Sequence, residues 1–517
     1  MSVKDYFGSI DTIIKRDDIR GVYRENIDED VARELGQALA SYFRRTTAVD
    51  PVNVVVGHDM RLSGPALSSA LGQGLSDGGC RPIHIGLTGT EQVGFLPAKY
   101  SDVIDGGIII TASHNPRKYI GFKMFGRGGQ PMTLAKSLPV PEPEDELQRL
   151  ALALKKQQIP ARLKWEDFAP DYVSTALERG GCDFERALEG ASDPLRVAVE
   201  AGNGMGGPLM REVERQVPQL EWNFSNDRAD GSFPVIVPNP LEEEYQNMLR
   251  ELVHESGSHM GMCLDGDADR VSICDENGDM ISPPFVTALI GKRLREKVGS
   301  DAKIAHNLAC SWAIADTLGD RDKVTQGGAT QLTPVGYGKI KVIMHKDPSI
   351  AMGAEHSGHY MFREFWCADS GMLTGLLMLE FAAELHSEGK TLSSAVQPLR
   401  NRYFESGEIN FNLPPEQPGE KVIERAVKEF QDEAVRIFCV TPDGARRVES
   451  YPPEGMELAV ADCRVEAEDW WFCMRKSGTE AAAGDKLRLY VESCGDASVM
   501  EDRRDKLVEM VGPDLRA

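Results

Sequence analysis

Three aspartates alternate in the segment Asp265-Gly266-Asp267-Ala268-Asp269-Arg270, directly after an apolar stretch that we expect to form a strand. Three carboxylates packed this closely repel one another unless a cation lies between them. Hard oxygen ligands favour Mg²⁺ over a transition metal. The segment therefore predicts a magnesium-binding loop.

Two other interpretations of this loop are possible. Glu276 falls at the twelfth position of an EF-hand loop, but Arg270 occupies the sixth position, where that loop requires glycine. The residues on both sides are typical of strands, and Asp275-Glu276-Asn277-Gly278 is typical of a hairpin turn. A solvated acidic turn is the second alternative.

A serine follows another expected strand. Residues 107–110 are an apolar run, and the chain then turns through Thr111-Ala112-Ser113-His114-Asn115-Pro116 and soon reaches Lys123. Most serines in this position form turns or cap helices. Phosphoryl transfer, however, needs mainly positioning and charge neutralisation. A serine beside a cation site could therefore carry a phosphate and pass it to a sugar hydroxyl.

Two further polar segments lie downstream. Glu355, Ser357 and His359 alternate, and in an extended segment they would share one side and could bind vicinal sugar hydroxyls. The segment Arg475-Lys476-Ser477-Gly478-Thr479 combines two cations, two hydroxyls and a glycine, which suits a phosphate group. A polar strand face and a surface turn are the structural alternatives.

The elements around these segments indicate several domains. A chain of 517 residues is too long for one core. Strands expected at residues 52–56, 83–86 and 107–110 alternate with helical patterns, as do strands at 195–199 and 260–264, which is typical of α/β units. The proline-rich residues 137–144 predict a linker. Strands with separate helices after residue 408 predict an α+β domain.

In their order along the chain, these four polar segments resemble those of the α-D-phosphohexomutase superfamily, most closely its phosphomannomutase/phosphoglucomutase branch. The resemblance extends from Arg20 to Glu492. It implies three related α/β domains with mixed sheets and a smaller α+β C-terminal domain, heart-shaped around a central cleft. We expect these domains at residues 1–150, 165–298, 299–402 and 405–517.

The resemblance also implies roles for single residues. Ser113 carries the transferred phosphate and completes a Mg²⁺ site with Asp265, Asp267 and Asp269. Lys123 is the candidate base. The supporting residues around the phosphoserine are Arg20, His114 and Arg270.

The remaining implied roles concern the substrate. Glu355 and Ser357 match the residues that bind the 3- and 4-hydroxyls of the sugar, and His359 belongs to the same sugar-binding loop. The phosphate that does not react is held by Arg475, Ser477, Gly478 and Thr479. Asp59 and Arg61, in contrast, are expected to be mainly structural.

The expected reaction interconverts hexose 1-phosphate and hexose 6-phosphate, with mannose and glucose as leading sugars. Mg²⁺ is the expected cofactor, and hexose 1,6-bisphosphate is the expected activator. The rivals are a phosphoglucosamine mutase, a Mg²⁺-dependent sugar phosphatase and a catalytically idle binding protein. Several segments depart from the family pattern and bear on the choice of sugar, among them residues 87–91, Tyr337, and the longer link after Glu480.

Composition limits the partners. The net charge of −23 argues against a general nucleic-acid binder, but local arginines can still hold an anionic sugar phosphate. Neither a signal peptide nor a membrane span is expected, so no membrane partner is predicted. The ten scattered cysteines suggest reduced thiols and a cytoplasmic protein.

Overall fold

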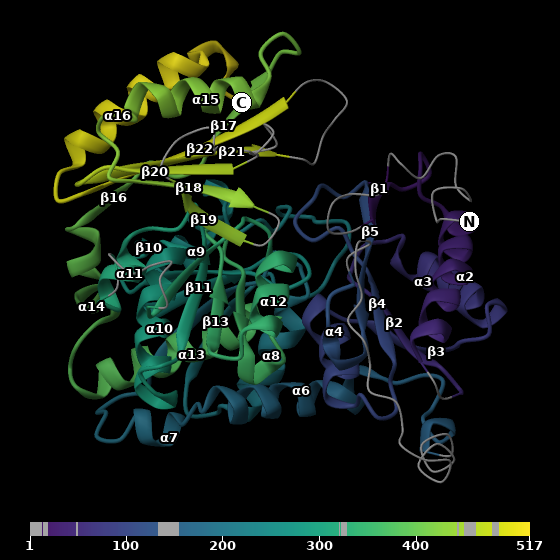
Figure 1. The fold of residues 1–517 in the computed structure, drawn as a ribbon. Coiled ribbons are helices and arrows are strands. Elements are labelled where there is room, and N and C mark those ends of the chain that lie inside the picture. Colours follow the sequence, from purple (N-terminus) through teal and green to yellow (C-terminus); the bar gives the residue numbers. More distant parts are fainter. Residues whose placement is uncertain are drawn as a thin grey trace. The chain divides into compact units, whose positions relative to one another are not determined.

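The computed structural model describes residues 13, 19–47, 50–132, 155–319, 321, 328–441, 444–448, 462–477 and 485–517. The chain forms two compact units, Met1–Ile281 with Gly358–Ser393, and Ser282–Ser357 with Ser394–Ala517. Figure 1 shows the ribbon. The predicted linker at residues 137–144 lies outside the described residues.

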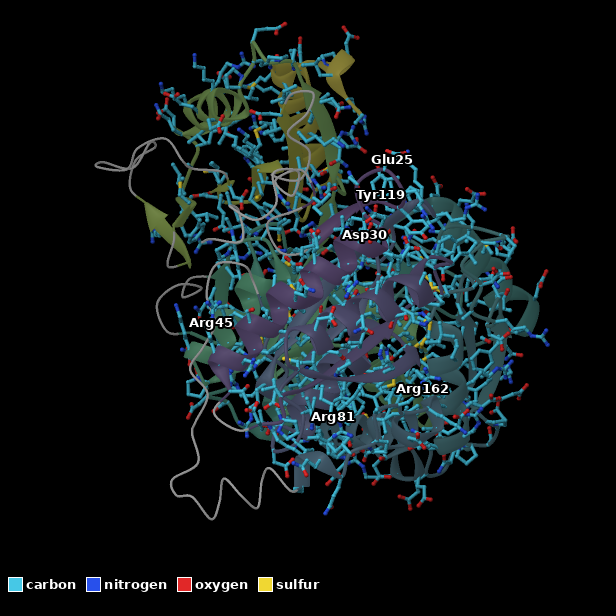
Figure 2. The ribbon with its side chains drawn as sticks, turned by 90° about the vertical axis from the view of Figure 1, so that its right-hand side faces the viewer. Glu25, Asp30, Arg45, Arg81, Tyr119 and Arg162 are labelled. Atoms are coloured by element: carbon cyan, nitrogen blue, oxygen red, sulfur yellow. The ribbon has the colours of Figure 1, made fainter. Side chains whose placement is uncertain are left out.

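A five-stranded mixed sheet with the order β1-β5-β4-β2-β3 begins the first unit. β2 is parallel to β3 and β4, whereas β5 is antiparallel to both β4 and β1. The sheet is mixed because a short loop, and not a crossover helix, joins β4 to β5. In Figure 2, Glu25 and Tyr119 are labelled near the paired ends of β1 and β5. The strands are β1 (Ile19–Val22), β2 (Asn53–His58), β3 (Arg81–Leu87), β4 (Gly106–Ile110) and β5 (Tyr119–Gly126).

Helices cover both faces of this sheet (Figure 1). α2 (Glu29–Thr46) and α3 (Gly64–Asp77) pack on one face against alternate strand residues such as Ile120 and Phe122. α4 (Thr90–Lys99) packs against β4 and β5. Because neighbouring side chains of a strand point to opposite faces, Lys123 lies on the face away from the α2–α3 core.

The second sheet of the first unit repeats this plan with the order β10-β9-β8-β6-β7. β6 is parallel to β7 and β8, and β9 runs antiparallel to β8 and β10. The predicted hairpin turn at residues 275–278 is confirmed, and the flanking strands exclude an EF-hand, which needs helices there. The elements are α6 (Trp165–Gly180), α7 (Phe184–Ala187), β6 (Arg196–Glu200), α8 (Gly206–Gln216), β7 (Glu221–Ser225), α9 (Glu243–Ser256), β8 (Met260–Leu264), β9 (Val271–Asp275) and β10 (Met280–Ile281).

Residues 358–393 complete the first unit. The short hairpin of β14 (Tyr360–Phe362) and β15 (Ala368–Asp369) leads into α13 (Gly371–Ser387), which packs against β8 and β9. α13 is apolar along most of its length, as expected for a helix buried on several sides.

The second unit begins with parallel strands in the order β12-β11-β13. Its elements here are α10 (Pro283–Val298), β11 (Lys303–Asn307), α11 (Ala313–Thr317), β12 (Thr330–Thr333), α12 (Tyr337–Lys346) and β13 (Ile350–Ala354). α14 (Leu392–Arg400) then leads to the C-terminal part of the chain.

An antiparallel sheet with two helices on one face forms the C-terminal part, as the sequence predicted (Figure 1). Its order is β16-β22-β21-β20-β18-β19, and β17 also pairs with β22. The elements are β16 (Tyr403–Glu405), β17 (Ile409–Leu413), α15 (Gly419–Phe430), β18 (Arg436–Thr441), β19 (Gly444–Val448), β20 (Asp462–Glu466), β21 (Trp470–Ser477), β22 (Asp485–Cys494) and α16 (Ala497–Val511).

The predicted fold class, three mixed α/β parts and an α+β C-terminal part, is confirmed. The four domain boundaries and the heart shape stay predictions. Among the described residues, no helix is both long and apolar enough to cross a membrane.

Candidate active site

Ser113 lies in the loop after β4, with its backbone in the left-handed region at φ 50°. This conformation is uncommon for residues other than glycine and must be held by its surroundings. The Arg61 guanidinium donates to the Ser113 carbonyl oxygen over 2.8 Å, and the Ser113 N–H donates to Thr111 Oγ1 over 2.9 Å. Asp59 accepts hydrogen bonds from both Arg61 and Thr111. The expected structural role of Asp59 and Arg61 is therefore specific: they hold the serine loop.

The Ser113 hydroxyl contacts the aspartate loop between β8 and β9. Its Oγ donates to Asp265 Oδ2 over 2.7 Å, and Arg270 Nη2 donates to the same Oγ over 3.1 Å. The guanidinium also binds Asp265 Oδ2, at 2.9 and 2.8 Å. A phosphate on Ser113 would thus lie beside the buried guanidinium of Arg270 and the buried carboxylate of Asp265.

The three predicted aspartates are all fully buried, with ligand oxygens within 4.8 Å of one another. Asp267 Oδ1 and Asp269 Oδ1 are buried and accept no hydrogen bond among the described residues. Burying carboxylate oxygens without donors is costly, and a divalent cation would satisfy them. The donor set therefore fits a metal ion, and an oxygen-only set of this kind suits Mg²⁺.

Lys123 projects from β5 into this cluster. Its Nζ lies 2.7 Å from Asp267 Oδ2 and 2.6 Å from Asp269 Oδ2, and its side chain is only 7% exposed. The lysine therefore neutralises part of the negative charge of the aspartate cluster.

The pKa values of the aspartates diverge. Burial raises the pKa of Asp265 to about 7, aided by the neighbouring carboxylates and opposed by Arg270. Burial also acts to raise the pKa of Asp267, but the contact with Lys123 outweighs it and lowers that pKa below its ordinary value. A bound cation would favour the ionised form of both groups.

Sequence reasoning missed Thr90, which supports the same cluster. Its hydroxyl contacts Asp267 Oδ2, and its backbone N–H donates to the Asp267 carbonyl oxygen over 3.0 Å. The sequence feature that could have drawn attention to Thr90 was the departure of residues 87–91 from the family pattern. Thr90 therefore fixes both the backbone and the side chain of one candidate ligand.

His114 and Arg20 lie near the serine, as predicted. His114 Nδ1 is 3.2 Å from Ser113 Oγ and also contacts Arg270. Burial and the adjacent Arg270 hold the pKa of His114 well below its ordinary value, so the imidazole is neutral. Arg20, on β1, donates to Asn115 Oδ1 over 3.2 Å within the serine loop.

His359 also reaches the aspartate cluster. Its Nδ1 lies 3.3 Å from Asp369 Oδ2 and 3.9 Å from Asp269 Oδ1. Burial acts to lower the pKa of His359, but the two carboxylates outweigh it and raise that pKa. The contact between Asp369 and this histidine was not predicted from the sequence.

Glu355, Ser357 and His359 would lie on one side only if this segment were extended, and it is not. β13 ends at Ala354, and residues 356–358 form a turn with Gly358 at φ 84°. The alternation rule holds for strands and fails across a turn. Glu355 and Ser357 belong to the second unit, whereas His359 belongs to the first.

Glu355 is buried and firmly held within the second unit. Its Oε1 accepts from the Gly336 N–H over 2.7 Å and from Asn307 Nδ2 over 3.1 Å. None of the described residues donates to Oε2. One oxygen of the carboxylate is thus occupied by the protein, and the other is available to a sugar hydroxyl.

The predicted phosphate segment begins at the end of β21. Arg475 is partly buried there and pairs across the sheet with Asp462 and Arg488. Lys476, in contrast, makes ion pairs with Glu420 and Asp485. Ser477 ends the strand, and its side chain, together with Gly478 and Thr479, lies outside the described part of the chain.

A second possible metal group, Asp193, His259 and His386, suits a cation less well. His259 Nδ1 accepts from the Arg196 N–H over 3.0 Å, and the Arg196 guanidinium lies 3.3 Å from Nε2. A metal-binding histidine normally donates through its other nitrogen. This group is therefore a structural cluster around Arg196.

Comparison with known proteins agrees with this geometry. Sequence models of the α/β/α domains I, II and III of phosphoglucomutase/phosphomannomutase match residues 11–138, 170–278 and 283–403. A phosphomannomutase from Escherichia coli K12 is 32% identical over 514 residues, covering 97% of this chain and 99% of the relative. The chain belongs to the phosphoglucomutase/phosphomannomutase family.

Solved structures of the family share the fold. A phosphoglucomutase/phosphomannomutase family protein from Burkholderia thailandensis gives a TM-score of 0.72 at 24% identity, covering 98% of each chain. The phosphoglucomutase pp63/parafusin from Paramecium gives 0.73 at 18% identity, covering 96% of this chain and 94% of its own. These likenesses agree with the fold of the chain described above.

Proposed function

We propose that this phosphohexomutase interconverts hexose 1-phosphate and hexose 6-phosphate through a phosphorylated Ser113. The observation that carries the proposal is the position of Ser113 Oγ, 2.7 Å from Asp265 and 3.1 Å from Arg270, beside three buried aspartates. Phosphoryl transfer depends on positioning and on neutralising charge, and this loop supplies both.

In the proposed cycle, phosphoserine gives its phosphate to the free hydroxyl of a hexose phosphate. The resulting hexose 1,6-bisphosphate then returns its other phosphate to Ser113, and the isomeric monophosphate leaves. Arg270 neutralises charge on the transferred group because its guanidinium already touches Ser113 Oγ. Lys123 is the candidate to exchange a proton with the reacting hydroxyl, and His114 and Arg20 support the serine loop.

Asp265, Asp267 and Asp269 would hold a Mg²⁺ ion, together with the phosphate on Ser113. When bound, the ion would neutralise charge on the phosphoryl oxygens. The two aspartate oxygens without donors are the observation that favours a cation here. Thr90 keeps Asp267 in place, and Lys123 keeps the second oxygens of Asp267 and Asp269 occupied.

We assign the substrate contacts to the residues that the sequence singled out, among them His359 of the sugar-binding loop. Glu355 and Ser357 would bind sugar hydroxyls, and Arg475, Ser477, Gly478 and Thr479 would bind the phosphate that does not react. Mannose and glucose phosphates are the leading substrates, which agrees with the phosphomannomutase relative at 32% identity. In the proposed cycle the same arginine binds the two phosphates of the bisphosphate in turn.

A substrate panel tests the proposal. Glucose, mannose and glucosamine 1-phosphates are each supplied with Mg²⁺, with and without a trace of the matching 1,6-bisphosphate, and both 6-phosphate and free phosphate are followed. Mannose or glucose 6-phosphate without phosphate release supports the proposal. Exclusive turnover of glucosamine phosphate would identify an amino-sugar mutase, and stoichiometric phosphate release would identify a phosphatase.

A further inference from the structure

A chain of hydrogen bonds links the C-terminal sheet to Glu355 inside the second unit. The Tyr490 hydroxyl, on β22, contacts Glu408 and lies 2.5 Å from His356 Nε2. His356 Nδ1 lies 3.0 Å from Asn307 Nδ2, and Asn307 Nδ2 lies 3.1 Å from Glu355 Oε1. Each step joins residues far apart in sequence, so the chain exists only in the folded unit.

The charge of Glu408 fixes the direction of the hydrogen bonds at the Tyr490 end of this chain. Glu408 is ionised, because contacts with His356, Arg488 and Arg475 outweigh burial and lower its pKa to about 2. Tyr490 must then donate to Glu408 and accept from His356 Nε2–H. His356 Nδ1 lies 3.0 Å from Asn307 Nδ2 and 3.3 Å from Asn307 Oδ1, so the asparagine amide contacts this ring nitrogen in either tautomer.

Asn307 is the junction between this chain and the sugar-binding carboxylate. Its amide nitrogen lies within hydrogen-bond distance of His356 Nδ1 and donates to Glu355 Oε1. Its Oδ1 accepts from the Ala309 N–H over 3.1 Å, which fixes the amide orientation. The asparagine therefore cannot rotate without losing contacts on both sides.

The end of the chain at the C-terminal sheet is held by an ion pair and a ring contact. Glu408 accepts from Arg488 Nη1, 3.0 Å from each carboxylate oxygen, and Arg488 pairs across the sheet with Arg475. The rings of Tyr490 and His356 pack edge to face at 4.7 Å, and Tyr490 is only 7% exposed. Glu408, which is close enough to Arg475 to be stabilised by its charge, is thus the far end of the same chain.

We propose that Tyr490, His356 and Asn307 are positioning residues for sugar recognition, which fix Glu355 with Oε1 bound to the protein and Oε2 free for one sugar hydroxyl. The proposal rests on the proposed function, since it names what orients the carboxylate of that site. A fixed acceptor rejects a sugar that lacks the matching hydroxyl, because the acceptor is then left unpaired in a buried place.

The test compares substrates that differ by one hydroxyl. kcat/KM is measured for the accepted hexose 1-phosphate and for its 3-deoxy and 4-deoxy analogues. The discrimination is defined as the kcat/KM of the hexose divided by that of the poorer analogue. The variants are Tyr490→Phe, which removes one hydroxyl, and Asn307→Ala, which removes the direct donor to Glu355. Tyr403→Phe is the matched control, since that hydroxyl donates to Asp316 in the same unit and does not reach Glu355.

We expect the wild type and the Tyr403→Phe control to discriminate at least about tenfold, and both test variants to discriminate about threefold or less. Equal losses of kcat/KM on all substrates, with discrimination unchanged in both variants, would overturn the positioning role. Absence of any hexose phosphate turnover by the wild type would instead overturn the proposed function on which it rests.

Discussion

Ser113 Oγ donates a hydrogen bond to Asp265 Oδ2 over 2.7 Å, although the two residues are 152 positions apart. This contact joins the loop after β4 to the loop after β8. Both loops follow a parallel strand of their own sheet and precede an antiparallel one. The shared strand plan thus gives each sheet a loop at the same structural position, and the two loops together make the candidate site.

Replacing Ser113 by alanine is expected to abolish turnover, with a loss of kcat of at least about a thousandfold, because the hydroxyl that is proposed to carry the phosphate is removed. The fold should persist, since one hydrogen bond contributes only about 1 kcal/mol. Steady-state kinetics and thermal unfolding measure both quantities. Ser63→Ala is a matched control, because that side chain makes no capping hydrogen bond at α3. A Ser113→Ala enzyme with the wild-type rate would refute the phosphoserine mechanism.

Replacing Asp267 by asparagine is expected to raise the Mg²⁺ concentration for half-maximal activity by about tenfold or more, because one ligand charge is lost. Isothermal titration calorimetry gives the dissociation constant for Mg²⁺ without turnover, and this constant should rise as well. Thr90→Ala should cause a smaller rise, since it removes only a hydrogen bond to that ligand. Identical metal dependence in the wild type and Asp267→Asn would place the cation elsewhere.

The elements of this fold could be predicted wherever the pattern is local. The apolar runs before Ser113 and Asp265 are strands, as expected, and the polar residues after them lie in loops. The turn at residues 356–358 could not be predicted from alternation, since it depends on Gly358 at φ 84°. The condition under which Glu355 and His359 would share one side is therefore not met.

Replacing Arg475 by alanine is expected to raise KM for the hexose phosphate by about tenfold to a hundredfold, because charge-assisted contacts to phosphate are lost. Lys476→Ala is the adjacent control. Its ammonium is already paired with Glu420 and Asp485, so its KM should change by less than about threefold. The reverse order of effects would show that the lysine, and not the arginine, binds the phosphate.

Replacing Glu408 by glutamine should destabilise the second unit in a pH-dependent way. The pKa of Glu408 is lowered from 4.5 to about 2, because contacts with His356 and Arg488 outweigh burial. A carboxyl group whose folded pKa is lowered stabilises the fold above its unfolded pKa, and this contribution disappears as the pH falls from 4.5 towards 2.

Urea unfolding followed by tryptophan fluorescence measures this effect. At pH 7 the variant should lose about 1–2 kcal/mol relative to the wild type, after allowance for solvent screening. The difference should shrink as the pH falls below 4.5. Glu388→Gln, which removes an exposed ion pair with Lys390, should change little at any pH. A Glu408→Gln difference that is constant between pH 7 and pH 3 would contradict the assigned ionisation.

The supporting residues of the site were the hardest to predict from sequence. Thr90, Asp369 and Asn307 act through Asp267, His359 and Glu355, which are distant in sequence for two of the three pairs. Such contacts depend on how sheets and loops pack, and a motif does not encode them. The candidate site residues themselves could be named from the sequence, because each group of them falls within a short segment.

The most direct test of the account is the transfer of phosphate to Ser113. The enzyme is incubated with hexose 1,6-bisphosphate labelled with ³²P, digested, and its peptides are mapped by mass spectrometry. The account predicts label on the peptide that contains Ser113, and its loss into sugar phosphate when unlabelled hexose 1-phosphate is added. Label on a different residue, or release of the label only as inorganic phosphate, would contradict the account.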